Sequence, residues 1–212
     1  MKEKQKQNKP QILAMSNTDF ELHEKETCFD GFFTVDKYFI SHKKFEGGQT
    51  EVFTREIFER GDAVVLMIYD SEKDKLILLE QFRAGAIRTL DNPWLLEFVA
   101  GMFDKNESPE DVAIREAYEE SGIIVKPEQL TKIMTYLSSP GGISEQIHLF
   151  VANVSIPESS GVYGLDEENE DILRHIVTRQ EALSLLEKGK ITNAATIIGL
   201  QWLALNYQSL QK

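Results

Sequence analysis

Two nearly continuous apolar segments constrain the fold of this chain more than any other feature: residues 63–70 (AVVLMIYD) and 75–82 (KLILLEQF). Only the turn sequence at 71–74 (SEKD) separates them, which predicts a hairpin of two strands. Strands that are apolar at almost every position are buried on both faces, so helices must cover both sides of the sheet. Helical periodicity predicts such helices at residues 108–121, 180–190 and 193–210. We therefore expect an α+β fold, a mixed sheet with flanking helices.

The remaining apolar segments fall into two zones of different character. Further strands of the main sheet are predicted at residues 94–102, 130–137, 145–154 and 171–178. Residues 17–58 predict three strands, and a small antiparallel sheet of this kind has little core of its own. This sheet must therefore pack on the rest of the chain or on a second copy. The predicted organisation is a flexible arm at 1–16, an N-terminal sheet region at 17–58 and a main domain at 59–212.

Composition argues against several kinds of partner. The 212 residues include 35 acidic and 23 basic ones, a net charge of −12, whereas nucleic-acid binding requires a basic face. No apolar run approaches the roughly 20 residues of a membrane span, and the apolar stretch after the basic N-terminus is too short for a signal peptide. We expect a cytoplasmic protein with no nucleic-acid or membrane partner. The single cysteine, Cys28, is expected to be a buried thiol.

The helix at 108–121 has clearly marked ends. Ser108 is suited to the N-cap, Pro109 to the first helical position, and Asp111 completes a capping box. Gly122 marks the C-terminal end.

A turn of about 100° per residue sorts the side chains of this helix onto two faces. The side expected to face the core holds four residues: Ala113, Ile114, Ala117 and Tyr118. The other side holds one cation and three carboxylates: Arg115, Glu116, Glu119 and Glu120. A solvated acidic face with an Arg115–Glu119 ion pair explains this pattern, and so does a site for Mg²⁺ or Mn²⁺, which prefer carboxylate oxygens. Helix geometry alone does not decide between the two.

The residues around the helix carry a longer motif. Seven fixed identities match the pattern GX5EX7REUXEEXGU, with Ala117 and Ile123 in its aliphatic positions: Gly101, Glu107, Arg115, Glu116, Glu119, Glu120 and Gly122. At residue frequencies near 6%, such a match arises by chance about once in a billion. This pattern is the Nudix box, and the chain resembles the Nudix hydrolases, which cleave nucleoside diphosphates linked to another moiety. The resemblance implies a Nudix-type α/β/α sandwich with its catalytic domain at 59–212.

The same resemblance implies roles for the box residues. Two or three Mg²⁺ ions, or Mn²⁺, would be bound by the Ala100 carbonyl, Glu116 and Glu120. Glu119 would be a ligand or a neighbour of the ligands, and Arg115 would orient the glutamates. Both are predicted to be catalytic residues. Glu107 has either a metal-binding or a structural role.

Further segments resemble one branch, the ADP-ribose pyrophosphatases: residues 55–61 (REIFERG), 95–102 (LLEFVAGM), 138–145 (SSPGGISE, with Pro140) and 164–172 (GLDEENEDI). Residues 166–171 (DEENED) alone would indicate a solvated loop. By resemblance, Glu170 completes the metal site and Glu168 is the general base, with Asp166 and Glu167 as alternatives. The expected reaction is Mg²⁺-dependent hydrolysis of ADP-ribose to AMP and ribose 5-phosphate.

Substrate contacts and assembly follow from the same resemblance. Arg83 is expected to bind a phosphate, and Phe32 and Arg55 to hold the adenine between an aromatic ring and a guanidinium. Ser139 and Gly142 are expected in a turn near the terminal ribose, and Glu145 is expected at the sugar or at a water-bridged phosphate. The N-terminal sheet is expected to form a homodimer. The alternatives are hydrolysis of GDP-mannose or another nucleotide sugar, and a non-catalytic module that senses ADP-ribose.

Overall fold

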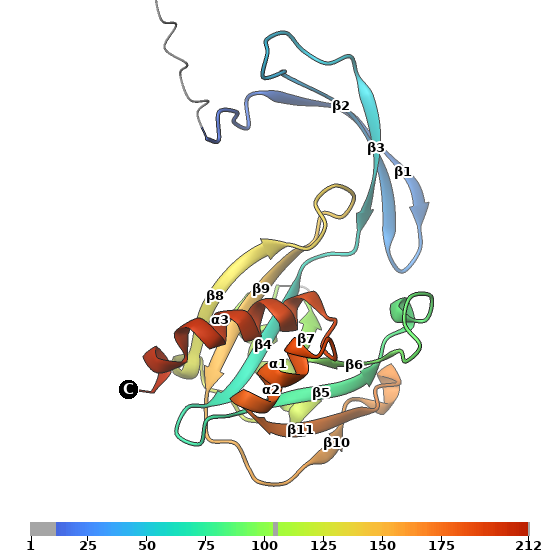
Figure 1. Ribbon diagram of the computed structural model, residues 1–212. Helices are drawn as coiled ribbons and strands as arrows, with labels where there is room; N and C mark the ends of the chain where they lie inside the picture. Colours follow the sequence, from blue (N-terminus) through green and yellow to red (C-terminus); the bar gives the residue numbers. More distant parts are fainter. Residues whose placement is uncertain (1–11, 104–105, 212) are drawn as a thin grey trace, which may run out of the picture. The chain divides into compact units, whose positions relative to one another are not determined.

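The computed structural model describes residues 12–103 and 106–211 and divides into two compact units (Figure 1). The N-terminal unit comprises Met1–Arg60 and Gly141–Ser144, and the central unit comprises Gly61–Pro140 and Glu145–Lys212. Of the predicted arm at 1–16, residues 1–11 lie outside the described residues. The predicted boundaries at 17–58 and 59–212 stay predictions.

The N-terminal unit is a three-stranded antiparallel sheet in the order β1-β2-β3 (Figure 1). Its strands are β1 (Phe20–Asp30), β2 (Thr34–His42) and β3 (Phe53–Glu59). The loop segment Gly141–Ser144 joins it, because the Phe58 N–H donates to the Gly142 carbonyl at 2.8 Å. Every residue of β1 is exposed. The prediction of a buried Cys28 is therefore wrong: Cys28 is exposed on β1, at a register shift where it is the extra residue of a β-bulge.

The central unit contains one mixed sheet, whose main path runs β10-β11-β5-β4-β9-β8. Its strands are β4 (Ala63–Asp70), β5 (Lys75–Phe82), β6 (Trp94–Glu97), β7 (Val99–Met102), β8 (Leu130–Leu137), β9 (Gln146–Asn153), β10 (Gly161–Tyr163) and β11 (Ile172–Thr178). Its helices are α1 (Pro109–Ser121), α2 (Arg179–Glu187) and α3 (Ala194–Leu210), with 3₁₀ turns at Ala84–Ala86, Pro127–Gln129 and Asp166–Glu168. No helix within the described residues is both long and apolar enough to span a membrane.

The predicted hairpin forms, but its two strands separate after the first two residue pairs. β4 and β5 pair only at Tyr69↔Leu76 and Asp70↔Lys75. Residues 94–102, predicted as one strand, form two: β6 pairs with β5 and β7 pairs with β4, with a break at Phe98. This segment therefore lies between the separating strands, and it leads the chain from the middle of the sheet toward α1.

Alternate residues of β4 face two different cores. Val64, Leu66 and Ile68 belong to the cluster that contains Ala113 and Ala117 of α1. The residues between them, such as Met67, pack in a second cluster with side chains of α2 and α3. Helices thus cover both faces of the sheet (Figure 1), and the expected α/β/α arrangement is confirmed.

Candidate active site

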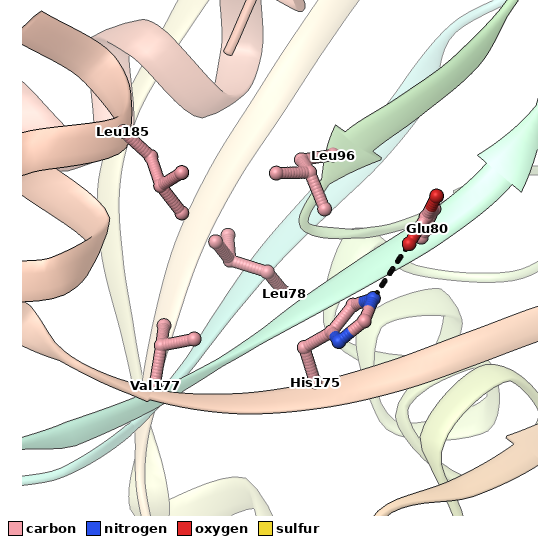
Figure 2. Close-up of a pocket in the computed structure, with 6 residues that line it drawn as sticks. All are labelled: Leu78, Glu80, Leu96, His175, Val177 and Leu185. Atoms are coloured by element: carbon pink, nitrogen blue, oxygen red, sulfur yellow. Dashed lines mark hydrogen bonds and ion pairs between the residues drawn. The ribbon is translucent and has the colours of Figure 1, made fainter. Parts of the chain in front are cut away.

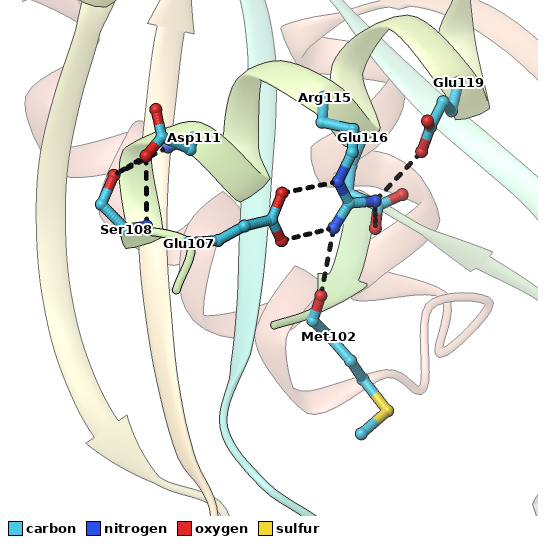
Figure 3. Close-up of polar contacts among 7 residues, drawn as sticks. All are labelled: Met102, Glu107, Ser108, Asp111, Arg115, Glu116 and Glu119. Carbon is cyan, nitrogen blue, oxygen red and sulfur yellow. Dashed lines mark hydrogen bonds and ion pairs between the residues drawn. The ribbon is translucent and has the colours of Figure 1, made fainter. Parts of the chain in front are cut away.

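The ends of α1 are fixed by the predicted cap residues. The Ser108 hydroxyl accepts from the Asp111 N–H at 3.2 Å, and the Asp111 carboxylate accepts from the Ser108 N–H at 3.2 Å (Figure 3). Gly122 has a left-handed φ of 67°, and a Cβ there would lie 2.6 Å from the Tyr163 ring. Glycine is therefore required at the point where α1 ends against β10.

The buried face of α1 differs from the predicted one. Tyr118, predicted to face the core, is 63% exposed, whereas Glu120, predicted to lie on the polar side, is 1% exposed. The small residues Ala113 and Ala117 are buried as predicted, and they allow the helix to approach the sheet closely. The buried face thus extends toward the carboxylates, so part of the acidic face lies against the sheet.

Arg115 binds the carboxylates next to it on α1 (Figure 3). Its Nη1 donates to Glu116 at 2.7 Å and to Glu119 at 3.0 Å. Its Nε and Nη2 donate to the two oxygens of Glu107, each at 3.0 Å, and Nη2 also donates to the Met102 carbonyl at 3.2 Å. The hydrogen bond that Arg115 donates to Glu107 is the largest of the effects that raise the pKa of Arg115. These five contacts use the full donor capacity of a guanidinium, which supports an orienting role for Arg115 and a structural one for Glu107.

Glu116 packs directly on strand β7, at Gly101. A Cβ at Gly101 would overlap the Glu116 carboxylate, so glycine is required at this position. Burial raises the pKa of Glu116 to about 7, although Arg115 opposes the shift.

Glu120 is the most deeply buried carboxylate of the helix. One oxygen accepts from the Ala100 N–H at 2.8 Å, and the other accepts from the Gln81 amide at 3.5 Å. The pKa of Glu120 is raised to about 8, chiefly by burial, and the negative charges of Glu116 and Glu170 contribute to this shift. The predicted ligands Ala100, Glu116, Glu120 and Glu170 are thus close enough to interact.

The acidic segment is folded as a short turn. Residues Asp166–Glu168 form a 3₁₀ turn, and Glu168 is exposed. The base of the segment is attached to α1, because the Gly164 N–H donates to the Glu119 carbonyl at 3.2 Å. The Glu170 carboxylate accepts from the Leu165 N–H at 3.3 Å, which holds Glu170 on the same turn.

The donor set fits a hard divalent cation in chemistry. Buried carboxylates that raise one another's pKa values are stabilised by a cation, and carboxylate oxygens suit Mg²⁺ and Mn²⁺. In the present side-chain arrangement, the described residues contain no group of three or more His, Cys, Asp and Glu side chains placed to bind one metal ion. The reason is visible in the contacts: Glu116 and Glu119 face Arg115, and Glu120 faces the Ala100 N–H.

Three of the predicted substrate contacts lie in the central unit. Arg83 forms an ion pair with buried Glu97, and its charge acts on Glu120, so Arg83 lies near the carboxylates. Glu145 is 4% exposed, and Ser139 is exposed. The sequence analysis did not single out Glu97, which is the one acid in the otherwise apolar segment 94–102. An acidic residue within an apolar strand was the only signal that could have indicated it.

The other three predicted contacts lie in the N-terminal unit. Phe32 is 89% exposed, with its ring centroid 4.7 Å from that of Phe33. Arg55 lies over the Phe53 ring, 4.7 Å from its centroid. Phe32 lies in the turn between β1 and β2, two residues before Thr34, the first residue of β2, which pairs with Glu59 of β3. Arg55 lies four residues before Glu59 on β3. About 13 Å of strand therefore separates Arg55 from the turn that carries Phe32. A single copy of the unit does not bring the side chains of Phe32 and Arg55 together. The third predicted contact, Gly142, is hydrogen-bonded to β3 through its carbonyl.

A separate hollow lies on the face of the sheet covered by α2 (Figure 2). It has a volume of about 220 Å³ and is lined by Leu78, Glu80, Leu96, His175, Val177 and Leu185. His175 and Glu80 pair at 2.8 Å, which agrees with a structural role for this histidine. None of the predicted site residues lines it.

Comparison with known proteins decides the family. A model of the NUDIX domain matches residues 59–198, which is most of the chain and includes the whole box. The chain belongs to the Nudix family. The chain is 46% identical to an ADP-ribose pyrophosphatase of Escherichia coli (strain K12), over 94% of both chains.

More distant Nudix relatives extend the comparison. A GDP-mannose pyrophosphatase of Pectobacterium atrosepticum is 31% identical over 87% of this chain and 94% of its own. A solved structure described as an ADP compounds hydrolase superposes with a TM-score of 0.67 at 24% identity, covering 91% of this chain and 98% of that one. This structural likeness confirms the Nudix fold. The chain is a Nudix hydrolase by its family, and the roles of individual residues stay predictions.

Proposed function

We propose that this protein hydrolyses the pyrophosphate of ADP-ribose to AMP and ribose 5-phosphate. The observation that carries the proposal is a pair of carboxylates on α1, partly buried Glu116 and fully buried Glu120, with Glu170 near enough to raise the pKa of both. Such a group is costly to bury unless a cation binds there. The identity to ADP-ribose pyrophosphatases supports the choice of substrate.

The metal ligands of this proposal are the Ala100 carbonyl, Glu116, Glu120 and Glu170. Two or three Mg²⁺ ions, or Mn²⁺, would be bound there. When bound, they neutralise the pyrophosphate oxygens and lower the pKa of a coordinated water. Arg115 orients Glu116 and Glu119 through its hydrogen bonds, so Arg115 is assigned a positioning role.

Glu168 is assigned as the general base. It is exposed on a turn whose base is attached to α1, so its carboxylate is available to a water at the site. It takes the proton of the attacking water, a role worth about 10²–10⁴-fold in rate. Arg83 binds a phosphate of the substrate, and Ser139, Gly142 and Glu145 line the sugar side.

The active form is proposed to be a homodimer built on the N-terminal sheet. Exposed apolar side chains on β1, which include Phe20, Leu22 and Phe29, support this assembly because they need cover. Phe32 and Arg55 are assigned to the adenine, and their separation in one copy fits a site to which two copies contribute. A cytoplasmic location stays a prediction.

The second candidate is hydrolysis of GDP-mannose, which the 31% identical relative favours. A sensor that does not hydrolyse ADP-ribose is disfavoured because all carboxylates of the box are present. The test is kcat/KM for ADP-ribose and GDP-mannose in one buffer with Mg²⁺, with the products identified. We expect the higher value for ADP-ribose, with AMP and ribose 5-phosphate as products; a higher value for GDP-mannose would favour the second candidate.

A further inference from the structure

Arg83 is positioned in the site by an unbroken chain of hydrogen bonds that starts at the C-terminal helix. Its Nε donates to one oxygen of Glu97 at 2.8 Å, and its Nη2 forms an ion pair with the same oxygen, also at 2.8 Å. The other oxygen of Glu97 accepts from the Asn193 amide at 2.9 Å. Asn193 is the N-cap of α3, and its Oδ1 accepts from the Thr196 N–H at 3.0 Å. The Thr196 hydroxyl in turn accepts from the Phe98 N–H at 3.2 Å, which closes the chain back onto the residue after Glu97.

The orientation of the Asn193 amide follows from its partners. A backbone N–H can only donate, so the atom facing Thr196 must be the amide oxygen. The amide nitrogen is therefore the group that faces Glu97, as a donor to a carboxylate should. Because Glu97 is 3% exposed and Thr196 is fully buried, this geometry is fixed by packing as well as by hydrogen bonds.

The contact with Glu97 leaves one edge of the Arg83 guanidinium available. Nε and Nη2 are used on the side edge, and Nη1 has no hydrogen-bond partner among the described residues. The end edge, formed by Nη1 and the second hydrogen of Nη2, presents two parallel donors of the kind that bind a phosphate. Arg83 lies two residues after Gln81, on the same face of the chain, and Gln81 contacts Glu120. The free edge is thus near the box carboxylates.

We propose that Asn193 is a positioning residue for substrate binding: through Glu97 it holds Arg83 with its end edge toward the pyrophosphate. This inference rests on the proposed function. Without the amide donor, Glu97 would keep its ion pair with Arg83 but lose the contact that fixes its own rotamer. Arg83 would then sample several orientations, and substrate affinity would fall while the reacting groups on α1 stay in place.

Asn193→Asp and Asn193→Ser separate this role from helix capping, because Asp and Ser are good N-caps but neither donates an amide N–H to Glu97. We expect Asn193→Ser to raise KM for ADP-ribose about five- to tenfold, the effect of one ordinary hydrogen bond, with kcat within about twofold of the parent. Asn193→Asp should raise KM at least as much, because its carboxylate would also repel Glu97. Thr178→Ala is the matched control, because it removes the N-cap of another helix, α2. The Thr178 hydroxyl accepts from the Glu181 N–H and makes no hydrogen bond with Glu97 within the described residues. This variant should lower the melting temperature and leave KM unchanged.

A double-mutant cycle with Arg83→Ala tests the route of the effect. If Asn193 acts through Arg83, adding Asn193→Asp to Arg83→Ala should change KM less than about twofold. An unchanged KM in both single variants would overturn the inference, and so would the same KM increase in the Arg83→Ala background. If Asn193→Asp does not fold, the cycle is measured with Asn193→Ser instead. The parent protein distinguishes the two claims. If the parent does not hydrolyse ADP-ribose, the proposed function is wrong. If the parent hydrolyses it and the variants have the same KM as the parent, only the inference about Asn193 is wrong.

Discussion

The two units of this molecule differ in how their sheets are covered. In the central unit, alternate residues of β4 face two closed cores, and Met67 is fully buried. In the N-terminal unit, every residue of β1 is exposed, and Phe29 is 60% exposed. Within residues 12–60 and 141–144, the buried side chains are polar ones, Asp36 and Ser41.

This difference indicates where stability and chemistry reside. The central unit buries its own apolar surface, and α1 with its carboxylates packs on its sheet. The N-terminal sheet has exposed apolar surface that needs a partner, and a second copy of this chain is the partner proposed. Changes in the central unit should therefore affect catalysis or folding directly, whereas changes on β1 should affect assembly first.

The largest effect is expected from Glu120→Gln in the central unit. The amide keeps an acceptor for the Ala100 N–H but cannot ionise to bind a cation, so metal binding should fail while the fold remains. We expect kcat to fall on the order of 10³-fold or more, with an unchanged or higher melting temperature. Near-normal turnover would remove the box from the mechanism.

A smaller loss is expected for the proposed base. Glu168→Gln should lower kcat by about 10²-fold or more with nearly unchanged Mg²⁺ and substrate binding, because a base moves a proton without binding the ions. Glu167→Gln, one residue away on the same 3₁₀ turn, is the matched control and should be mild. The measurement is a Mg²⁺ titration at saturating ADP-ribose; a severe Glu167→Gln with a mild Glu168→Gln would shift the assignment by one residue.

In the N-terminal unit, Leu22→Glu should weaken the dimer. Leu22 is 45% exposed on β1, and a charge there would be buried without a partner at the proposed interface. Light scattering at micromolar concentration should show at least a tenfold weaker dimer, about the effect of a central interface residue. Leu205→Glu, at an 85% exposed position on α3, is the control and should leave the mass unchanged. A monomeric parent protein would refute the assembly.

The smallest effect is expected for an ion pair inside the central unit. Asp74 accepts from Arg179 at 2.8 Å through both oxygens and from the Tyr69 hydroxyl at 2.7 Å. Burial opposes ionisation of Asp74, but these hydrogen bonds prevail and lower its pKa. A lowered pKa contributes stability above the ordinary value of 3.8, which is lost as the pH falls through the folded-state value.

Asp74→Asn should therefore lower the free energy of unfolding at pH 7 by about 1 kcal/mol, a value kept small because the side chain is about one-third exposed. Asparagine tolerates the left-handed φ of 51° at this position. Urea unfolding of parent and variant at pH 7 and pH 3 measures the difference, which should narrow at pH 3. A difference that is constant or larger at pH 3 would contradict the assigned cause.

Local patterns predicted much of the central unit. The predicted segments at 63–70, 75–82 and 130–137 coincide with strands, and Ser108 and Gly122 mark the ends of α1 as expected. These features depend on residues close in sequence, where periodicity and capping chemistry are informative. The break at Phe98 was not predictable in this way, because it arises from pairing of one segment with two different strands.

The chemistry of the candidate site was visible as a spacing of glutamates, but its burial was not. The rotation per residue predicted Tyr118 in the core and Glu120 on the polar side. In the structure Tyr118 is exposed and Glu120 is buried, so the sheet covers the side of α1 that carries Glu120. The contacts of Glu97 with Arg83 and Asn193 join residues up to 96 positions apart, so no local sequence pattern predicts them. The exposure of Cys28 likewise follows from its place on β1, an edge strand on which every residue is exposed.

The most direct test of the account is metal-dependent product formation by the intact protein. After treatment with EDTA, the protein should release no AMP or ribose 5-phosphate from ADP-ribose, because the α1 carboxylates would lack the cation that the substrate requires. Adding Mg²⁺ or Mn²⁺ in excess of the chelator should restore hydrolysis. Hydrolysis at full rate in EDTA would contradict the central claim that the carboxylates of α1 act by binding divalent metal ions.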